Sequence, residues 1–289
     1  MSDESTGDQA QPLERVQLGH SPDSDDAFMF YALAEHKIDT AGFEFEHVLR
    51  DIETLNQWAR EGKLEITAIS AHAYAYVSDK YAVLSHGASM GDNYGPMVVT
   101  REAVDANWLK GKHIAIPGTM TSAFLALQLY LGEFEYDIIP FDQIMDAVKD
   151  GRAEAGLLIS ETQLTHVSAG LHTVVDLGKW WHGETDGLPL PLGVNAVRRD
   201  LGAEKMAALS RVLKASIQYS LDHRADALRH AMQYARGLAA ETADTFVGMY
   251  VNDWTLDMGS RGKESMRLFL KRAFERGLIP ADPTVDFVD

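Results

Sequence analysis

An apolar strand stops and a helix opens within residues 113–122, His-Ile-Ala-Ile-Pro-Gly-Thr-Met-Thr-Ser. The first amides of a helix have no intrahelical acceptor and carry a partial positive charge, so they favour an anion. Hydroxyl side chains at the same place add further donors. We therefore expect Gly118, Thr119, Thr121 and Ser122 to bind a carboxylate or phosphate, although an ordinary capped helix shows the same local pattern.

Other predicted strands also end in polar residues. Ser21, Asp25 and Asp26 follow a strand near the N-terminus and lead into an apolar helix. Ligands of open α/β sheets bind at the carboxyl ends of strands, so polar residues gathered at such ends indicate a site. The polar residues that follow the remaining strands are Asp51, Ser70 with His72, and Ser160 with Glu161.

Length and composition limit the class of protein. The chain has 289 residues, of which 46% are hydrophobic, enough for two domains or one large one. No run approaches the roughly 18 apolar residues that a membrane span needs. Residues 1–14 show no secretion signal and are expected to form a disordered acidic tail. Without cysteine, the chain has neither disulfides nor thiolate metal sites, and we expect it to be cytoplasmic.

The formal net charge of −17 argues against partners that are themselves polyanions. Nucleic acid and anionic membranes would both be repelled by the summed field. A small anion is still admissible, because a local group of N–H donors overrides a distant net charge. A metal ion at the acidic run 23–26 is disfavoured, because no histidine or further carboxylate stands at coordinating spacing.

Strand-like and helix-like segments alternate along most of the chain, which predicts an α/β fold. The expected strands are 16–19, 43–48, 65–69, 97–100, 113–116, 136–140, 155–159 and 174–177, and the expected helices are 26–36, 51–60, one from Ser70, 120–132, 142–150, 203–222, 223–237 and 240–252. Residues 180–193 are expected to form an irregular connector, in which Trp180 and Trp181 either stack on an aromatic ligand or fill the hinge.

Two α/β units followed by a helical return predict two lobes with a ligand cleft between them. We expect the first lobe to comprise residues 15–99 and 195–289 and the second to comprise residues 100–194. The cleft would bring together the polar residues that follow the strands of both lobes.

Several motifs occur in one order along the chain and resemble the 1,4-dihydroxy-6-naphthoate synthase family of the futalosine route to menaquinone. The motifs are residues 21–33 (SPDSDDAFMFYAL), 51–58 (DIETLNQW), 70–76 (SAHAYAY), 117–124 (PGTMTSAF), 155–159 (AGLLI) and 187–193 (GLPLPLG). The resemblance runs from about residue 16 to the end. It implies a two-lobed fold like that of periplasmic solute-binding proteins of type II, and cleavage of cyclic dehypoxanthinyl futalosine without a metal or organic cofactor.

The resemblance also assigns residues. Ser70 and Thr121 match positions that hold the substrate's polar groups from opposite lobes, and Ser122 matches a neighbouring hydroxyl. Asp25 and Asp26 match an Asn-Asp or Asp-Asp pair. The substrate's carboxylate would suit residues 119–122, and Asp51 would accept a hydrogen bond from a sugar-derived hydroxyl.

One position departs from the family pattern. The family has a histidine, its expected base, where this chain has Ser160, which precedes Glu161. A serine hydroxyl by itself is no general base near neutral pH. Candidates for another base are His20, His72 and Glu161. The departure also leaves open a second function, a protein of the same fold that binds a small anionic or aromatic carboxylate and catalyses nothing.

Overall fold

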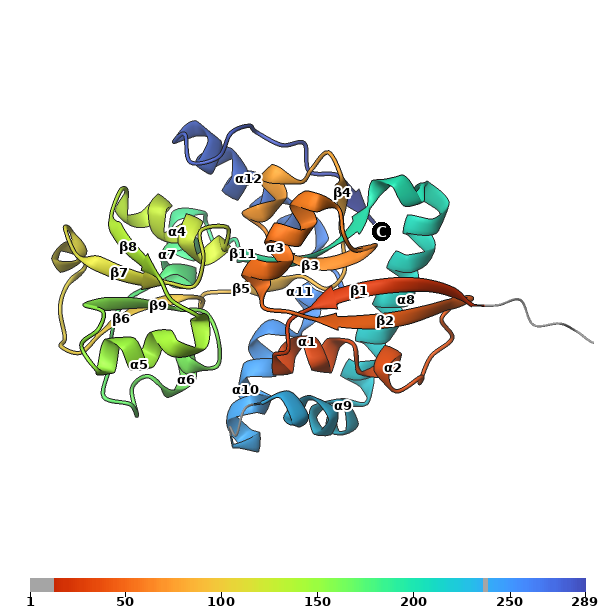
Figure 1. Cartoon of the computed structure of the whole chain (residues 1–289), viewed down its shortest axis with the longest axis horizontal. Coiled ribbons are helices and arrows are strands. Elements are labelled where there is room, and N and C mark those ends of the chain that lie inside the picture. Colours follow the sequence, from red (N-terminus) through yellow and green to blue (C-terminus); the bar gives the residue numbers. More distant parts are fainter. Residues whose placement is uncertain (1–12, 236–238) are drawn as a thin grey trace, which may run out of the picture.

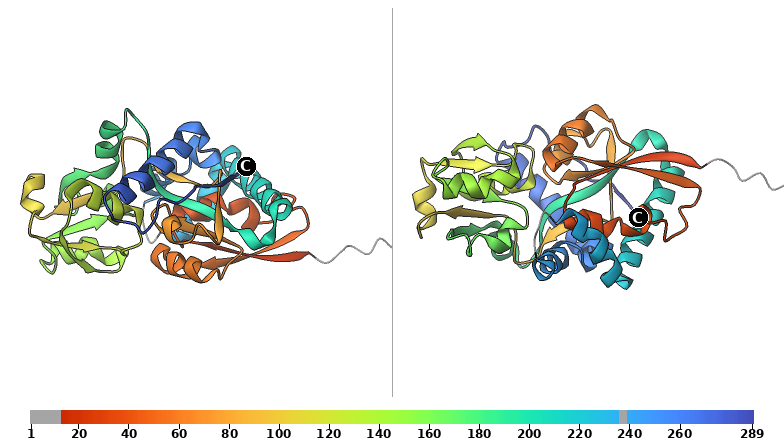
Figure 2. Two further views of the ribbon diagram at one scale, coloured as in Figure 1. Left: turned by 90° about the horizontal axis from the view of Figure 1, so that it is seen from above. Right: turned by 60° about the horizontal axis from the view of Figure 1, so that its bottom comes forward.

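Two lobes, each built around one mixed sheet, make up the computed structural model, which describes residues 13–235 and 239–289 (Figure 1). Two further views show the lobes side by side along the longest axis (Figure 2). Most of the expected acidic tail, residues 1–12, lies outside the described residues, and the first strand already begins at Glu14.

The first sheet has the strand order β12-β4-β11-β3-β1-β2, and β5 pairs with β11 at the side of this path. β1 is parallel to β2 and β3, whereas β11 runs antiparallel to β3 and β4. The strands are β1 (Glu14–His20), β2 (Phe43–Leu49), β3 (Ile66–Ser70), β4 (Tyr81–Leu84), β5 (Ser89–Gly91), β11 (Leu190–Arg198) and β12 (Phe287–Val288).

The second sheet has the strand order β10-β6-β9-β7-β8. β7 is parallel to β8 and β9, and β6 runs antiparallel to β9 and β10. The strands are β6 (Met97–Thr100), β7 (His113–Ile116), β8 (Glu135–Ile138), β9 (Ala155–Leu158) and β10 (His172–Asp176). The chain thus leaves the first sheet between β5 and β6 and rejoins it at β11.

Some helices, α3 among them, begin at a residue whose side chain caps them. Asp51 accepts a hydrogen bond from the Thr54 amide at the start of α3, and Gly62, with φ of 69°, ends that helix. The α-helices are α1 (Ser24–Met29), α2 (Tyr31–Ala34), α3 (Ile52–Glu61), α4 (Ser122–Leu131), α5 (Ile144–Lys149), α6 (Thr162–Thr165), α7 (Leu177–Glu184), α8 (Ala203–Asp222), α9 (Arg224–Ala231), α10 (Ala240–Tyr250), α11 (Asp253–Leu256) and α12 (Gly259–Glu275). None of the described helices is both long and apolar enough to cross a membrane.

The segment 180–193, expected to be an irregular connector, is instead helix α7 followed by strand β11. The Asp176 carboxylate caps α7 by accepting from the amides of Gly178 and Lys179. Trp181 is fully buried and donates from Nε1 to Ser265 Oγ at 3.0 Å, so it packs in the core. Proline and glycine suggested a loop, but long-range pairing with β3, β4 and β5 makes the strand.

Two shorter segments also differ from expectation. The helix expected at 26–36 is divided at Phe30 into α1 and α2. The helix expected from Ser70 is a single 3₁₀ turn over Ala73–Tyr76. That tight turn places the residues that follow β3 against the start of α4 in the other lobe, where the His72 amide donates to Ser122 Oγ at 3.2 Å.

Candidate active site

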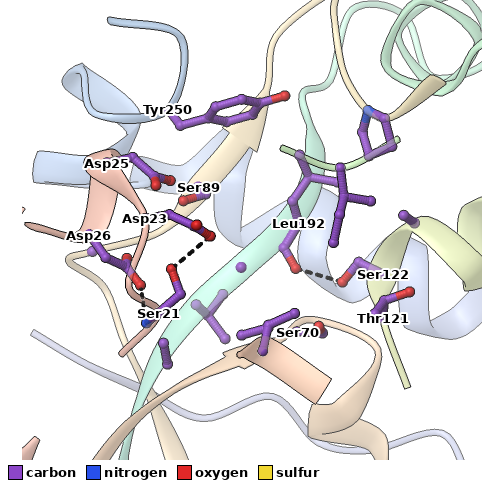
Figure 3. A pocket seen from close by; sticks show the side chains of 18 of the residues that line it. Ser21, Asp23, Asp25, Asp26, Ser70, Ser89, Thr121, Ser122, Leu192 and Tyr250 are labelled. Atoms are coloured by element: carbon purple, nitrogen blue, oxygen red, sulfur yellow. Dashed lines mark hydrogen bonds between the residues drawn. The ribbon is translucent and has the colours of Figure 1, made fainter. Parts of the chain in front are cut away.

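A cavity of about 130 Å³ lies between the lobes, at the carboxyl ends of β1, β3, β7 and β9 (Figure 3). Strand β11, where the chain returns to the first lobe, contributes the floor from Leu192 to Asn195. The lining residues are Ser21, Asp23, Asp25, Asp26, Ile52, Ala68, Ser70, Gly87, Ser89, Pro96, Thr121, Ser122, Ala123, Ile159, Leu192, Gly193, Val194, Asn195, Phe246 and Tyr250. Because both lobes supply its wall, the cavity exists only when the lobes meet.

Several predicted site residues meet in this one cavity: Ser21, Asp25, Asp26, Ser70, Thr121 and Ser122. Ser70 comes from the end of β3 in the first lobe, and Thr121 precedes α4 in the second. Both side chains are buried, with 3% and 2% of their surface exposed. Figure 3 shows them on one side of the cavity and the aspartates on the other.

The acidic side of the cavity is built by the turn between β1 and α1. The Ser21 amide donates to Asp26 Oδ2 at 2.7 Å, and Ser21 Oγ donates to Asp23 Oδ2 at 3.0 Å. Burial raises the pKa of Asp26 to about 6, against the lowering effect of the hydrogen bonds from Ser21. Burial also raises the pKa of Asp25, and the negative charges of Asp26, Asp23 and Glu161 raise it further.

The opposite side offers hydrogen-bond donors. Asn56 donates from Nδ2 to Ser70 Oγ at 3.0 Å, which leaves the hydroxyl hydrogen of Ser70 able to point into the cavity. Thr121 Oγ1 caps α4 by accepting from the Phe124 amide at 3.2 Å. The amides of Ser122 and Ala123, at the first two positions of α4, have no intrahelical acceptor, and both residues line the cavity. Such donors have the chemistry that an anionic group requires.

Gly118 and Thr119, predicted to bind the same anion, do not line the cavity. The protein's own Glu53, from α3 in the first lobe, occupies this part of the junction. Its Oε2 accepts from the Met120 amide at 3.2 Å, and a Cβ added to Gly118 would lie 2.4 Å from that oxygen. At this part of the helix start, the carboxylate that accepts from the backbone is thus the protein's own, from the opposite lobe.

Three further predicted residues also lie outside the cavity wall. Asp51 caps α3, where it accepts from the Thr54 amide and hydroxyl. Ser160 Oγ lies 3.0 Å from Thr162 Oγ1. Glu161 is buried and accepts from Ser24 Oγ at 3.2 Å, which links the two lobes beside the cavity.

The two candidate histidine bases are both buried, and neither lines the cavity. His20 donates from Nδ1 to the Ser21 carbonyl, and its Nε2 lies 2.9 Å from His47 Nδ1. His72 donates from Nδ1 to the Thr121 carbonyl at 3.2 Å, and its Nε2 has no partner among the described residues. Burial lowers the pKa of His20 to about 3 and that of His72 to about 4, so both are neutral at physiological pH.

Residues that sequence reasoning missed complete the cavity. Tyr250, at the end of α10, lies above the acidic side (Figure 3) and donates from its hydroxyl to Gln163 Oε1 of the other lobe at 2.9 Å. Burial raises the pKa of this phenol, so it stays protonated. Asn195 on β11 is 1% exposed and donates to the Gly87 carbonyl at 3.2 Å. Neither residue stands at a strand end, so the pattern that identified the others could not identify them.

Comparisons with known proteins agree over nearly the whole chain. A family model described as menaquinone biosynthesis matches residues 16–275. A 1,4-dihydroxy-6-naphthoate synthase from Thermus thermophilus is 40% identical over 96% of this chain and 100% of the relative. One from Streptomyces coelicolor is 36% identical over 93% of this chain and 96% of the relative.

Solved structures agree with the fold. The crystal structure of a protein from Archaeoglobus fulgidus has a TM-score of 0.88 and 46% identity, and covers 92% of this chain and 98% of its own. The alkanesulfonate-binding protein of Xanthomonas axonopodis pv. citri has a TM-score of 0.72 at 12% identity, over 96% and 98% of the two chains, which shows the shared periplasmic-binding-protein-like fold alone. The chain therefore belongs to the menaquinone biosynthesis family, together with the 1,4-dihydroxy-6-naphthoate synthases to which it is similar over 93% and 96% of its length.

Proposed function

We propose that this protein is a lyase that cleaves cyclic dehypoxanthinyl futalosine to 1,4-dihydroxy-6-naphthoate in menaquinone biosynthesis. The observation that carries the proposal is the end-to-end similarity to two synthases of that name, at 36% and 40% identity. The cavity between the lobes supports it, because one side offers donors for a carboxylate and the other offers carboxylates for proton transfer. We further propose that the enzyme acts in the cytoplasm and needs no metal or organic cofactor.

The substrate's carboxylate would bind at the first turn of α4. The amides of Ser122 and Ala123 and the hydroxyl of Ser70 would donate to it, which removes the need for a buried arginine. Closure of the lobes around the bound molecule would exclude water from the reaction. The contacts from Ser24 to Glu161 and from Tyr250 to Gln163 would hold the closed form.

Turnover by the purified protein tests the proposal. Incubation with cyclic dehypoxanthinyl futalosine should yield 1,4-dihydroxy-6-naphthoate, detected by liquid chromatography and mass spectrometry, and heat-denatured protein should yield none. Binding without product would instead support the non-catalytic carboxylate-binding protein of the same fold, which the serine at position 160 suggested.

Ser70→Ala tests where the carboxylate binds. Loss of the hydroxyl donor should weaken binding roughly tenfold, or about 1.4 kcal/mol. The matched control is Ser168→Ala, which removes an exposed hydroxyl of the second lobe that donates to the Thr165 carbonyl. Equal dissociation constants for the two variants, measured by calorimetry, would place the carboxylate elsewhere.

A further inference from the structure

None of the described residues that line the cavity is a histidine, although the proposed reaction requires a group that moves a proton. Within the part of the chain that the structure describes, the titratable side chains on this wall are Asp23, Asp25, Asp26 and Tyr250. Tyr250 is a protonated donor to Gln163 and cannot start the reaction as a base. The base therefore has to be sought among the three aspartates.

The three carboxylates differ in the hydrogen bonds that they accept. Asp26 accepts a short bond from the Ser21 amide, and Asp23 accepts from the Ser21 hydroxyl. Such bonds stabilise the ionised form and oppose the rise that burial causes in the pKa of Asp26. Ser21 thus occupies an oxygen of each of these two carboxylates and fixes their positions around the turn before α1. Asp25 accepts no hydrogen bond from Ser21; it accepts one from the backbone of Asp26, and Figure 3 shows it beside Tyr250 and Ser89.

We propose, on the basis of the lyase function above, that Asp25 is the base of this enzyme and that Glu161, which reaches it from the other lobe, is a positioning residue. Asp25 is surrounded by the negative charges of Asp23, Asp26 and Glu161, with Tyr250 of α10 also facing it. Like charges at close range favour the protonated carboxyl, so this position makes an aspartate a stronger base than it is in water.

The lobes must meet for Glu161 to act. Ser24 Oγ, next to Asp25 in the sequence, donates to Glu161 Oε1 at 3.2 Å and so brings the glutamate to the acidic side of the cavity. Opening of the lobes would remove this charge and weaken the base. Asp25 would therefore become fully basic only when a bound molecule is enclosed.

The step is a redox-neutral proton transfer. The Asp25 carboxylate takes a proton from a substrate hydroxyl or an acidic C–H group and becomes a carboxylic acid. The electron pair left on the substrate forms the new carbonyl or double bond as the carbon–carbon bond breaks. The electrons of that bond stay on the departing carbon, which takes the proton back from Asp25, so the enzyme ends as it began.

Asp25→Asn tests the proposal, because it keeps the shape of the side chain and removes the base. In deuterium oxide, we would measure naphthoate formation and deuterium incorporation into substrate and product. The variant should lose about 10²–10⁴-fold in both rates and bind the substrate within about threefold of the original protein. Asp142→Asn, an exposed aspartate of the second lobe, should keep both rates and is the matched control.

The dependence of kcat/KM on pH distinguishes a base from a structural residue. This measurement also tests the proposal if Asp25→Asn fails to fold. The value of kcat/KM should rise with pH as Asp25 ionises. Glu161→Gln should move this rise in kcat/KM to lower pH, because it removes one of the negative charges that favour the protonated form of Asp25. If kcat/KM of the variant rises at the same pH as that of the original protein, the role of Glu161 and of the negative charges around Asp25 is overturned.

The outcomes distinguish the two proposals. If the original protein forms naphthoate and folded Asp25→Asn does so within tenfold, Asp25 is not the base and the lyase function stands. If the original protein neither forms product nor exchanges deuterium, the lyase function fails and the role of Asp25 fails with it. Product from the original protein, with loss of both rates but not of binding in the variant, supports both.

Discussion

Two strand-to-helix junctions face each other across the cavity, and they use similar residues in opposite ways. After β1, the turn from Ser21 to Asp26 points its carboxylates along the cavity wall and uses Ser21 to hold two of them in place. After β7, the turn from Gly118 to Ser122 presents backbone amides. Glu53 of the opposite lobe already accepts a hydrogen bond from one of them, the Met120 amide. One junction brings charge to the site, and the other supplies donors to it.

The comparison shows that a helix start can be recognised from sequence while its occupant cannot. Both junctions follow a buried strand and precede an apolar helix. Only the arrangement of the lobes decides that the Met120 amide meets Glu53 while the amides of Ser122 and Ala123 stay available. Neighbouring amides of one turn thus differ: the Met120 amide makes a contact between the lobes, whereas Ser122 and Ala123 line the cavity.

The largest effect on stability is expected from Asp26→Asn, at the junction between β1 and α1. An unfolded aspartate has a pKa near 4, whereas the pKa of folded Asp26 is about 6, so between these values the folded state binds the extra proton. The free energy of unfolding therefore falls as pH rises through this window, by about 3 kcal/mol. Asparagine does not ionise, so the stability of the variant relative to the original protein should rise as pH rises from 4 to 7.

Urea unfolding at pH 4 and pH 7 measures this difference. Asp142→Asn, at an exposed position, should follow the original protein at both pH values. A difference between Asp26→Asn and the original protein that does not change with pH would show that Asp26 is not held in a costly ionised state.

An intermediate effect on stability is expected from Glu53→Ala, at the junction between β7 and α4. Loss of a charged acceptor from the Met120 amide should lower the free energy of unfolding by about 1–2 kcal/mol and weaken the contact between the lobes. Gly118→Ala should act through the same contact, because its Cβ would displace the Glu53 carboxylate. The double variant should therefore lose less than the sum of the two single losses.

Thermal unfolding of the four proteins in this cycle is the measurement, with the exposed Glu133→Ala as the matched control. Strict additivity would indicate that the two residues stabilise the protein independently and that Glu53 does not occupy the junction.

The smallest effect is expected from Thr121→Val, which removes the cap of α4. The Phe124 amide would lose its acceptor, and the free energy of unfolding should fall by about 1 kcal/mol. Thr119→Val, two residues earlier and outside the cavity wall, should change stability by less than half as much. Equal losses for the two variants in urea unfolding would show that the hydroxyl of Thr121 has no special role.

Much of the fold could be predicted because its determinants are local. The strand at 113–116 and the capped helix after it are confirmed as β7 and α4, and the alternating residues of 43–48 form β2. The segment 180–193 was predicted wrongly, since a strand that contains Pro191 forms only because β3, β4 and β5 are there to pair with it. Partners that lie a hundred residues away leave no mark on the local pattern.

The site divides in the same way. The sequence by itself determined which side chains follow the strands, and among these Ser70, Thr121, Asp25 and Asp26 line one cavity. Only the tertiary structure decided that His20 and His72 do not line that cavity, that Glu53 accepts from the amide of Met120, and that Tyr250 lies above the acidic side. The physical reason is that a strand end fixes where a residue's backbone lies, whereas packing between the lobes fixes the direction and the charge state of its side chain.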